Sequence, residues 1–450
     1  MKSTAVILAA GQGTRMKSST PKILHPLAGQ PMITYPVEAA TRATSEIPVV
    51  VVGHQADEVR AALGEACRFV VQAEQLGTGH AVQQAEDQLA GQTDLVLVIN
   101  GDLPLLTGDT LDRLVLTQTT GRAAFTMLTR LTDQSRGFGR VVRDTSGEVM
   151  KIVEESQATP EQLAIRELNV GAYCFAADWL WEALRGIKVS PKGEFFLTDL
   201  VEIAFEGGDR VQGIPIEDPS EALGINNRVH LAEVEAALRR RINRRWMEAG
   251  VTMIDPESTY IDARATIGED TEIWPNTYLL GDTAIGEGCR IGPNSYVVDS
   301  KIGDRCIVLA SFMEGARLEN DVDIGPFARL RKGAHLKDGV HMGNFGEVKN
   351  SVLGPGTKVG HFSYIGDATI GPRVNIGAGT ITCNYDGKNK FHTEIEEGAF
   401  IGSDTMLVAP VKLGKGANTG AGAVVTKDIP AHTLAAGVPA RVIRKLDEDD

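Results

Sequence analysis

The sequence has few of the features that stabilise secreted proteins. Its 450 residues include only five cysteines, an odd number, and no two of them form a Cys-x-x-Cys pair. This scarcity excludes a disulfide framework and a cysteine-based zinc site, and it indicates reduced thiols in a cytoplasmic protein. No apolar run reaches the length of a membrane-spanning helix. The short apolar run after Lys2 leads directly into a Gly-rich loop, so we do not interpret it as a signal peptide.

Positive charge is also scarce. The formal net charge is −14 at pH 7, which excludes general binding to nucleic acid or to an acidic membrane. It does not exclude a phosphate substrate, which needs only local positive charge. With 42% hydrophobic and 23% charged residues, the chain has the composition of a soluble globular protein with room for two or three domains.

A repeat of an aliphatic residue followed by Gly dominates the chain from about residue 267 to about 425. A six-residue period is typical of a parallel β-helix of hexapeptides, in which each aliphatic side chain points into a prism. Gly suits the corners because it adopts positive φ at little cost. A Gly-rich β-sandwich is the alternative, and the strict spacing favours the β-helix. The period is carried by Ile267, Ile273, Leu279, Ile285, Ile291 and Val297, and again by Ile395, Ile401, Leu407 and Leu413.

The first part of the chain has a different pattern, in which apolar runs alternate with helical segments. Such alternation predicts a doubly wound α/β sheet, whose ligands lie beyond the carboxyl ends of the strands. The expected strands are at 5–8, 47–52, 69–71 and 95–99, and the expected helices are at 56–63, from about 80 to 89, and from 193 to 200.

Polar residues gather where these strands end. The loop from Gly11 to Arg15 can bring backbone amides close to a phosphate, with Lys22 just beyond it, although a plain strand–turn connection is the alternative. Asp102 follows a buried strand, where it either caps the next helix or binds Mg²⁺. This ion prefers one or two protein oxygens plus substrate phosphates. Asn226 offers a second oxygen donor for the same ion.

A β-hairpin region follows, with members at 137–142, 152–154 and 169–173. In it, Glu154 and Asn169 are either surface polar residues or hydrogen-bonding partners for sugar hydroxyls.

The segment from Arg228 to about Ala249 has the apolar period of a connecting helix. Its arginines at 239–241 and 244–245 could form a nucleic-acid patch, but the overall acidity favours a solvated helix face.

Three features interrupt the C-terminal repeat. Arg331 and Lys349 are eighteen residues apart, one full coil, so the two cations should stack. An anion between them, such as a sugar phosphate, would relieve their repulsion. His361 follows in the next coil, where a lone histidine is usually a surface residue. The segment 383–392 abandons the hexapeptide rule and must form a loop on a rigid scaffold, where functional residues often lie. We interpret Cys383 as a bystander thiol.

Together these motifs resemble a known family. The stretches 8–16, 21–22, 72–79 and 101–102 are similar to the sugar-1-phosphate nucleotidyltransferases. With the C-terminal repeats, the whole chain resembles the bifunctional N-acetylglucosamine-1-phosphate uridyltransferase/glucosamine-1-phosphate acetyltransferases. The resemblance implies an α/β doubly wound nucleotidyltransferase domain followed by a left-handed parallel β-helix of hexapeptide repeats. One departure is Asn100, where the family often carries an aromatic residue.

The resemblance also implies two reactions. The C-terminal domain transfers acetyl from acetyl-CoA to glucosamine 1-phosphate. The N-terminal domain then couples N-acetylglucosamine 1-phosphate to UTP and releases pyrophosphate, with Mg²⁺ as cofactor. In the second reaction the sugar phosphate attacks in line, and Arg15, Lys22 and Mg²⁺ offset the developing charge.

The resemblance further assigns individual residues. His361 is the expected general base, because imidazole titrates near neutrality and can take a proton from the attacking amine. The residues expected at the uridylyl site are Leu8, Ala9, Ala10, Gly11, Arg15, Lys22, Gln72, Gly77, Thr78, Asn100, Gly101, Asp102, Gly139, Glu154, Asn169 and Asn226. The sugar phosphate of the acetyl site is expected at Arg331, Lys349, Tyr364 and Asn375. Acetyl-CoA is expected at Ala378, Asn384, Tyr385, Ser403, Ala421 and Arg441, the last as a displaced candidate for the family's C-terminal arginine.

We expect a uridyltransferase domain at 1–227, a connecting helix at 228–250 and an acetyltransferase domain at 251–450 with an acidic tail at 447–450. The resemblance implies a homotrimer packed side to side. The physical reason is that loops such as 383–392 should be unable to fold onto their own smooth rod and enclose a pocket, whereas they can reach a neighbour's rod. No nucleic-acid or membrane partner is expected.

Two alternatives remain open. One is a single-activity nucleotidyltransferase whose β-helix only assembles or regulates, and the other is a non-enzymatic assembly subunit of the same architecture. His361 and the loop at 383–392 argue against an inert rod. Arg15, Lys22 and Asp102 argue against an inactive N-terminal domain.

Overall fold

The computed structural model describes residues 1–191 and 193–446, so the acidic tail at 447–450 lies outside the described residues. The chain forms two compact units, Met1–Leu238 and Arg239–Asp450, and the boundary falls inside helix α9 (Arg228–Glu248). The domain limits expected at 227 and 250 stay predictions. Among the helices of the described residues, none is long and apolar enough to cross a bilayer.

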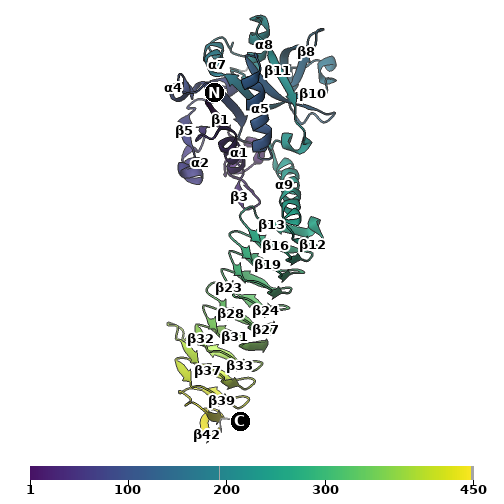
Figure 1. Ribbon diagram of the computed structural model, residues 1–450. Helices are drawn as coiled ribbons and strands as arrows, with labels where there is room; N and C mark the ends of the chain where they lie inside the picture. The colour runs from purple at the N-terminus through teal and green to yellow at the C-terminus, as the bar shows by residue number, and fades with distance from the viewer. Residues whose placement is uncertain (192, 447–450) are drawn as a thin grey trace. The chain divides into compact units, whose positions relative to one another are not determined.

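A mostly parallel sheet organises the first unit (Figure 1). Its strand β1 (Ser3–Ala9) pairs in parallel with β4 (Val49–Val52) on one side and with β6 (Leu95–Asn100) on the other. These strands are continuous apolar runs because both faces of the sheet are covered. Over the described residues the sheet has nine strands, with β11-β7-β10-β6-β1-β4-β5 as its main path. The others are β5 (Arg68–Val71), β7 (Phe125–Leu131), β8 (Arg140–Arg143), β9 (Val149–Val153), β10 (Glu167–Ala176) and β11 (Val211–Pro215).

Helices cover both faces of this sheet, as a doubly wound fold requires. Side chains of α1, α2 and α5 share one hydrophobic core with the sheet, and those of α3, α7 and α8 share the other. The predicted α/β class is therefore confirmed. The helices are α1 (Thr34–Thr44), α2 (Ala56–Leu63), α3 (Thr78–Gln83), α4 (Glu86–Leu89), α5 (Gly108–Thr120), α6 (Pro160–Leu163), α7 (Ala177–Leu184) and α8 (Asp199–Glu206).

The prediction of a helix from 193 to 200 is wrong for residues 193–198, because α8 begins at Asp199. The residues before it bond to the loop that precedes α3 instead. Phe195 N donates to the Leu76 carbonyl at 2.7 Å, and the Phe195 carbonyl accepts from Gly79 N at 2.8 Å. These bonds replace helical ones and satisfy the same backbone groups. The helix expected to reach residue 89 is likewise divided, into α3 and α4.

The second unit is a prism whose three sides are parallel β-sheets and whose interior is hydrophobic (Figure 1). Over the described residues they have twelve, ten and nine strands, beginning with β12 (Thr252–Met253), β13 (Thr259–Ile261) and β14 (Thr266–Ile267). The strands pair in parallel from coil to coil, except for the last pair, β41 (Thr433–Ala436) and β42 (Arg441–Lys445). The residues of the six-residue period point inward, with Ile273, Leu279, Ile291 and Val297 0% exposed. The predicted left-handed β-helix of hexapeptide repeats is confirmed.

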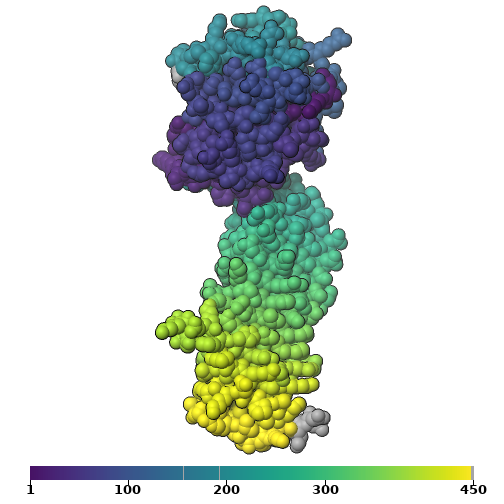
Figure 2. Space-filling model, turned by 90° about the vertical axis from the view of Figure 1, so that its left-hand side faces the viewer, coloured from purple at the N-terminus to yellow at the C-terminus, as the bar shows by residue number. Residues whose placement is uncertain are grey.

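One coil of the prism is longer than its neighbours. Val359 pairs with Ile376, an advance of 376 − 359 = 17 residues, whereas Ile376 pairs with Ile401, an advance of 401 − 376 = 25. The extra length lies after β34 (Ile381–Cys383), in the loop predicted at 383–392. Figure 2 shows a yellow-green projection from the rod at this part of the chain.

Candidate active sites

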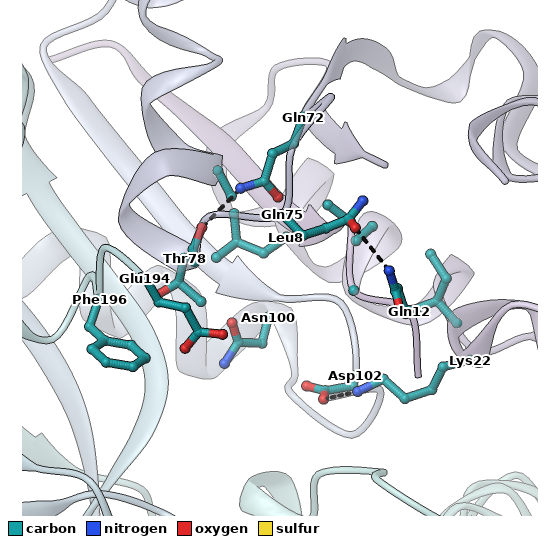
Figure 3. Close-up of a pocket in the computed structure, with 16 residues that line it drawn as sticks. Leu8, Gln12, Lys22, Gln72, Gln75, Thr78, Asn100, Asp102, Glu194 and Phe196 are labelled. Carbon is teal, nitrogen blue, oxygen red and sulfur yellow. Dashed lines mark hydrogen bonds and ion pairs between the residues drawn. The ribbon is translucent and has the colours of Figure 1, made fainter. Parts of the chain in front are cut away.

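A cavity of about 460 Å³ lies at the carboxyl ends of β1 and β6 (Figure 3). Leu8 and the Gly loop leave the end of β1, Asn100 ends β6, and Thr78 opens α3. Because parallel strands end at one edge of a sheet, residues far apart in sequence meet here. The predicted uridylyl-site residues in the cavity wall are Leu8, Ala9, Ala10, Gly11, Lys22, Gln72, Gly77, Thr78, Asn100 and Asp102.

Two loops of this cavity are held by specific contacts. Gly77 has a φ of 99°, and a Cβ there would lie 2.5 Å from the Phe195 carbonyl oxygen, so only glycine permits this approach. The buried Gln72 side chain donates to the Gly77 carbonyl at 3.0 Å. Gln12 Nε2 donates to Gln75 Oε1 at 3.1 Å, which ties the Gly loop to the next strand end (Figure 3).

Six wall residues were not among the predicted site residues. They are Gln12, Ile23, Gln75, Ala81, Glu194 and Phe196. Gln12 and Gln75 lie within motifs that the sequence singled out. Glu194 and Phe196 enter the wall only because residues 193–198 pack against the Gly77 loop instead of forming a helix.

The charged edge of this site consists of two cation–oxygen pairs. Lys22 Nζ lies 2.6 Å from Asp102 Oδ2 (Figure 3), and Arg15 Nη2 donates to Asn226 Oδ1 at 2.8 Å. The two pairs are neighbours, because Ile225 N donates to the Asp102 carbonyl at 3.1 Å. The structure thus brings together the predicted metal ligands and the predicted phosphate-binding cations.

A second cavity, of about 250 Å³, shares Leu8, Thr78, Asn100 and Phe196 with the first. The predicted residues Gly139, Glu154 and Asn169 line it.

Asn100 stands in the common wall of the two cavities. A Cβ on Gly171, whose φ is 85°, would lie 2.4 Å from Asn100 Nδ2, so the Asn100 amide packs directly on this glycine.

Hydrogen bonds fix the polar side chains of the second cavity. Asn169 Nδ2 donates to the Tyr173 hydroxyl at 2.6 Å, and Asn169 Oδ1 accepts from Gly171 N at 3.2 Å. Burial raises the pKa of Glu154, and the charge of Asp199 acts in the same direction. The hydrogen bond that Thr198 Oγ1 donates to Glu154 at 3.2 Å opposes the shift. Paired oxygen and nitrogen groups in a small cavity suit recognition of sugar hydroxyls.

Three predicted residues of the first unit are not among the described residues that line either cavity. Gly101 lies behind the wall, where its amide donates to the Leu8 carbonyl at 2.9 Å. Arg15 and Asn226 form the pair described above, at the charged edge.

In the second unit, His361 ends β30 (Lys358–His361) and lies exposed at a corner of the prism. It pairs in register with Asn344 of β27 (His341–Asn344), and its Nδ1 lies 3.3 Å from Asn344 Oδ1. If Nδ1 donates to this amide oxygen, Nε2 presents its lone pair to solvent, which a general base requires. Asn344 was not predicted, and its only sequence signal is its position one coil before His361.

The same corner carries three of the residues predicted to bind acetyl-CoA. The strand register places Ala378 one coil after His361, then Ser403 and then Ala421. Bonds between adjacent coils agree with this register, since Asp404 N donates to the Ala378 carbonyl at 2.6 Å and Gly422 N donates to the Ser403 carbonyl at 2.8 Å. Small side chains thus form an open edge leading away from His361.

Cations gather on the adjacent sheet. Arg331 N donates to the Val348 carbonyl at 2.9 Å, which stacks Arg331 beside Lys349 in the next coil. Lys349 is in register with Gly366, and a Cβ there would lie 2.4 Å from the Tyr364 hydroxyl. Arg331, Lys349 and the Tyr364 hydroxyl therefore converge. Asn375 instead begins β33 (Asn375–Ile376) on the twelve-stranded sheet.

A third cation, Lys390, was missed because it lies in the irregular loop. Its contact and charge lower the pKa of Lys349, as do loss of solvation and Arg331, whereas Asp367 acts in the opposite direction. Besides Asp367, a second carboxylate is present, since Arg331 Nη1 lies 3.0 Å from Glu347 Oε1. Three cations with two carboxylates leave an excess of positive charge that can attract a phosphate.

The two ends of the loop at 383–392 are bonded to its own rod. Asn384 Nδ2 donates to Asp367 Oδ2 at 2.5 Å, and His392 Nε2 lies 3.0 Å from Thr369 Oγ1. The rod is therefore not smooth here, because polar side chains project from it and hold the base of the loop. The expectation that this loop helps to enclose a pocket on a neighbour's rod stays a prediction.

The remaining predicted residues lie at the edges of this region. Tyr385 is 61% exposed and donates to the Gly387 carbonyl at 2.6 Å within the loop. Arg441 is exposed at the start of β42, and its Nη1 donates to the Ala440 carbonyl. Burial raises the pKa of Cys383, so its thiol stays protonated and a poor nucleophile.

Comparison with known proteins gives the same two-part division. The family model of the MobA-like NTP transferase domain matches residues 5–249, and that of the bacterial transferase hexapeptide (six repeats) matches 264–298 and 392–427. A curated relative from Heliobacterium modesticaldum, "Bifunctional protein GlmU", is 50% identical and covers 96% of this chain and 95% of its own. Relatives with the same description from Pelobacter propionicus and an Exiguobacterium strain are each 47% identical, covering 98% and 97% of this chain and 97% of their own. A solved UDP-glucose pyrophosphorylase complexed with UDP-glucose has a TM-score of 0.44 and 19% identity, covering 54% of this chain and 100% of its own.

Proposed function

The chain belongs to the bifunctional GlmU family, and on that premise we propose that it makes UDP-N-acetylglucosamine in two steps. The hexapeptide unit acetylates glucosamine 1-phosphate with acetyl-CoA, and the nucleotidyltransferase unit then joins the product to UTP. The observation that carries this proposal is the presence, in one chain, of two chemically different sites. One has paired cavities with a Lys22–Asp102 edge, and the other has an exposed His361 beside a cation cluster.

For uridylyl transfer, the larger cavity takes UTP and the smaller one takes the sugar. Asn100 stands between them, where the two substrates meet. A phosphate oxygen of the sugar phosphate attacks the α-phosphorus of UTP, and the bond to the leaving pyrophosphate breaks. Lys22 and Arg15 lie at the edge where negative charge develops, so they stabilise it by position and electrostatics.

The donor set at this edge fits a divalent cation. Asp102 offers a carboxylate oxygen and Asn226 an amide oxygen, the hard ligands that Mg²⁺ takes together with substrate phosphates. When bound, the ion would neutralise phosphate charge in the transition state. Lys22 and Arg15 hold the two oxygens in the structure described here, and substrate phosphates can draw the cations away.

For acetylation, the Arg331, Lys349 and Lys390 cluster holds the phosphate of glucosamine 1-phosphate. Acetyl-CoA lies along the edge formed by Ala378 and Ser403. His361 Nε2 removes a proton from the attacking ammonium, and the free amine adds to the thioester carbonyl. Collapse of the adduct forms the amide and releases CoA as its thiol.

A single incubation tests this function. With glucosamine 1-phosphate, acetyl-CoA, UTP and Mg²⁺, the chain should release both CoA and pyrophosphate. Without UTP it should release CoA alone, and without acetyl-CoA it should release neither. Pyrophosphate release in the absence of acetyl-CoA would show that glucosamine 1-phosphate is itself uridylylated and would overturn the proposed order. All five cysteines are free thiols, which supports our placing both reactions in the cytoplasm.

Glu154→Gln should stabilise the folded chain at neutral pH and at the same time weaken binding of the sugar phosphate. The pKa of Glu154 is raised in the folded chain, so its ionised form costs stability at neutral pH. This cost disappears as the pH falls through the folded-state pKa toward the ordinary carboxyl value. The variant should therefore melt at a higher temperature than wild type at pH 7 and at the same temperature in acid. Loss of a charged hydrogen-bond acceptor should raise the KM for the sugar phosphate roughly tenfold.

Calorimetry across pH and initial-rate kinetics measure these two effects. Glu148→Gln, in the exposed turn of the same hairpin, is the matched control and should change neither. A Glu154→Gln protein with wild-type KM would remove Glu154 from the sugar site.

We also infer that the chain assembles as a homotrimer through its prism. Phe327, Phe345 and Phe362 follow one another along one corner and are 59%, 60% and 57% exposed. The rings of Phe327 and Phe345 stack 5.4 Å apart. An exposed apolar ladder of this kind is typical of a protein contact. It lies beside His361, so a neighbouring chain seated on it would close the acetyl site, and three flat sides favour threefold assembly.

Phe345→Glu should place a charge in this contact and yield a folded monomer. Acetyl transfer should be lost, while uridylyl transfer, which uses residues of the first unit alone, should be unchanged. Sedimentation gives the mass and the two product assays give the activities. A monomer that still acetylates at the full rate would overturn the shared-site idea.

A further inference from the structure

Arg228, the first residue of α9, contacts both loops that carry the cations of the uridylyl site. We propose that Arg228 is a positioning residue for uridylyl transfer. Its guanidinium forms hydrogen bonds with the Met16 carbonyl and the His25 ring, and these bonds hold Arg15 and Lys22 in place. This inference rests on the function proposed above.

The first contact fixes the Gly loop. Arg228 Nε donates to the Met16 carbonyl at 3.3 Å, one residue after Arg15. Met16 is 1% exposed, and its amide donates to the Gly13 carbonyl at 2.9 Å. The carbonyl and the amide of Met16 are thus both hydrogen-bonded, which restricts the position of the neighbouring Arg15 backbone.

The second contact fixes the turn that carries Lys22. Arg228 Nη1 lies 3.3 Å from Nδ1 of His25, whose amide donates back to the Lys22 carbonyl at 3.3 Å. His25 is 4% exposed. Burial, followed by the charge of Arg228, lowers the pKa of His25, which favours the neutral ring. In the neutral ring, Nδ1 can accept a hydrogen bond from the Arg228 guanidinium.

These contacts close two rings of interactions that share Arg228. In the first ring, Arg228 donates a hydrogen bond to the Met16 carbonyl. Arg15, the residue before Met16, donates to Asn226, which lies two residues before Arg228. In the other, Arg228 reaches His25, and the nearby Lys22 pairs with Asp102, whose carbonyl accepts from Ile225 N. The segment from Ile225 to Arg228 therefore constrains both cations and both proposed metal ligands at once.

Arg228 acts through other residues rather than on substrate. It is not among the described residues that line either cavity of the uridylyl site. It lines a separate groove with Pro26, Ala28 and Leu231, between the β2–β3 pair (Pro26–Leu27 and Gln30–Pro31) and α9. Loss of its guanidinium should therefore affect the rate of the bound complex more than substrate affinity.

The test compares Arg228→Met and Arg228→Lys in the full chain. Arg228→Met should lower kcat for uridylyl transfer by ~10- to 100-fold, since small misplacements of reacting groups have effects of this size. KM for UTP and for the sugar phosphate should stay near wild type, and acetyl transfer should not change. Arg228→Lys can donate a hydrogen bond to one loop but not to both, so its kcat should lie between that of the wild type and that of Arg228→Met. Arg240→Met, from the same helix and paired with Glu257, is the control and should retain full kcat.

Thermal unfolding is measured for each variant. If Arg228→Met does not fold, the kcat of folded Arg228→Lys decides the question. An unchanged kcat would overturn the proposal, and so would a rise in KM at unchanged kcat, which would indicate direct substrate contact. A wild-type chain that releases no pyrophosphate would instead refute the proposed function itself, so the two failures are distinguishable.

Discussion

Asp102→Ala should lower pyrophosphate release by at least ~10²-fold while leaving CoA release unchanged. The change removes the carboxylate that pairs with Lys22 and that we assign to the metal, so the site loses a group that stabilises transition-state charge. The acetyl site lies in the other compact unit and uses none of these residues. Assays of both products on the same protein, with saturating substrates, measure the effect.

Two further variants sharpen this test. Asp102→Asn keeps the size and one oxygen, so a comparable loss would assign the effect to charge. Asp109→Ala removes an exposed carboxylate paired with Arg42 and should affect neither activity. Equal loss of both activities in Asp102→Ala would mean that the two sites are not independent.

His361→Ala should lower acetyl transfer by ~10²-fold or more, the range for loss of a general base. Without the imidazole, the ammonium group of the substrate keeps its proton and cannot attack the thioester. Uridylyl transfer from supplied N-acetylglucosamine 1-phosphate should be unchanged. CoA release at neutral pH, followed by a thiol reagent, gives the rate.

His341→Ala is the matched control, because His341 is exposed on the same sheet and pairs with Asp323 at 2.6 Å. It should acetylate normally. If His361→Ala retained acetylation within a few-fold of wild type, His361 would be a surface residue and the assignment of the base would be wrong.

Much of the fold could be predicted because its signals are local. The runs that became β1 and β6 are continuously apolar, as strands buried on both faces must be. The prism could be predicted because one six-residue rule repeats through most of the unit. Both patterns depend on neighbouring residues alone.

The rest depends on contacts between distant segments, which no local pattern reports. Lys22 and Asp102 are 80 residues apart, and Arg15 and Asn226 are 211 apart. Their roles could be proposed separately, but their pairing could not. Residues 193–198 look helical, yet backbone bonds to the Gly77 loop prevail. Lys390 had no signal because its loop breaks the repeat that locates every other residue of the prism.

The central claim is that one chain holds two complete sites, the product of one being the substrate of the other. Mixing the Asp102→Ala and His361→Ala proteins tests it most directly. Given glucosamine 1-phosphate, acetyl-CoA, UTP and Mg²⁺, neither protein alone should form UDP-N-acetylglucosamine, and the mixture should form it. A mixture that releases CoA but forms no nucleotide sugar, although His361→Ala uses supplied N-acetylglucosamine 1-phosphate at the wild-type rate, would contradict the account.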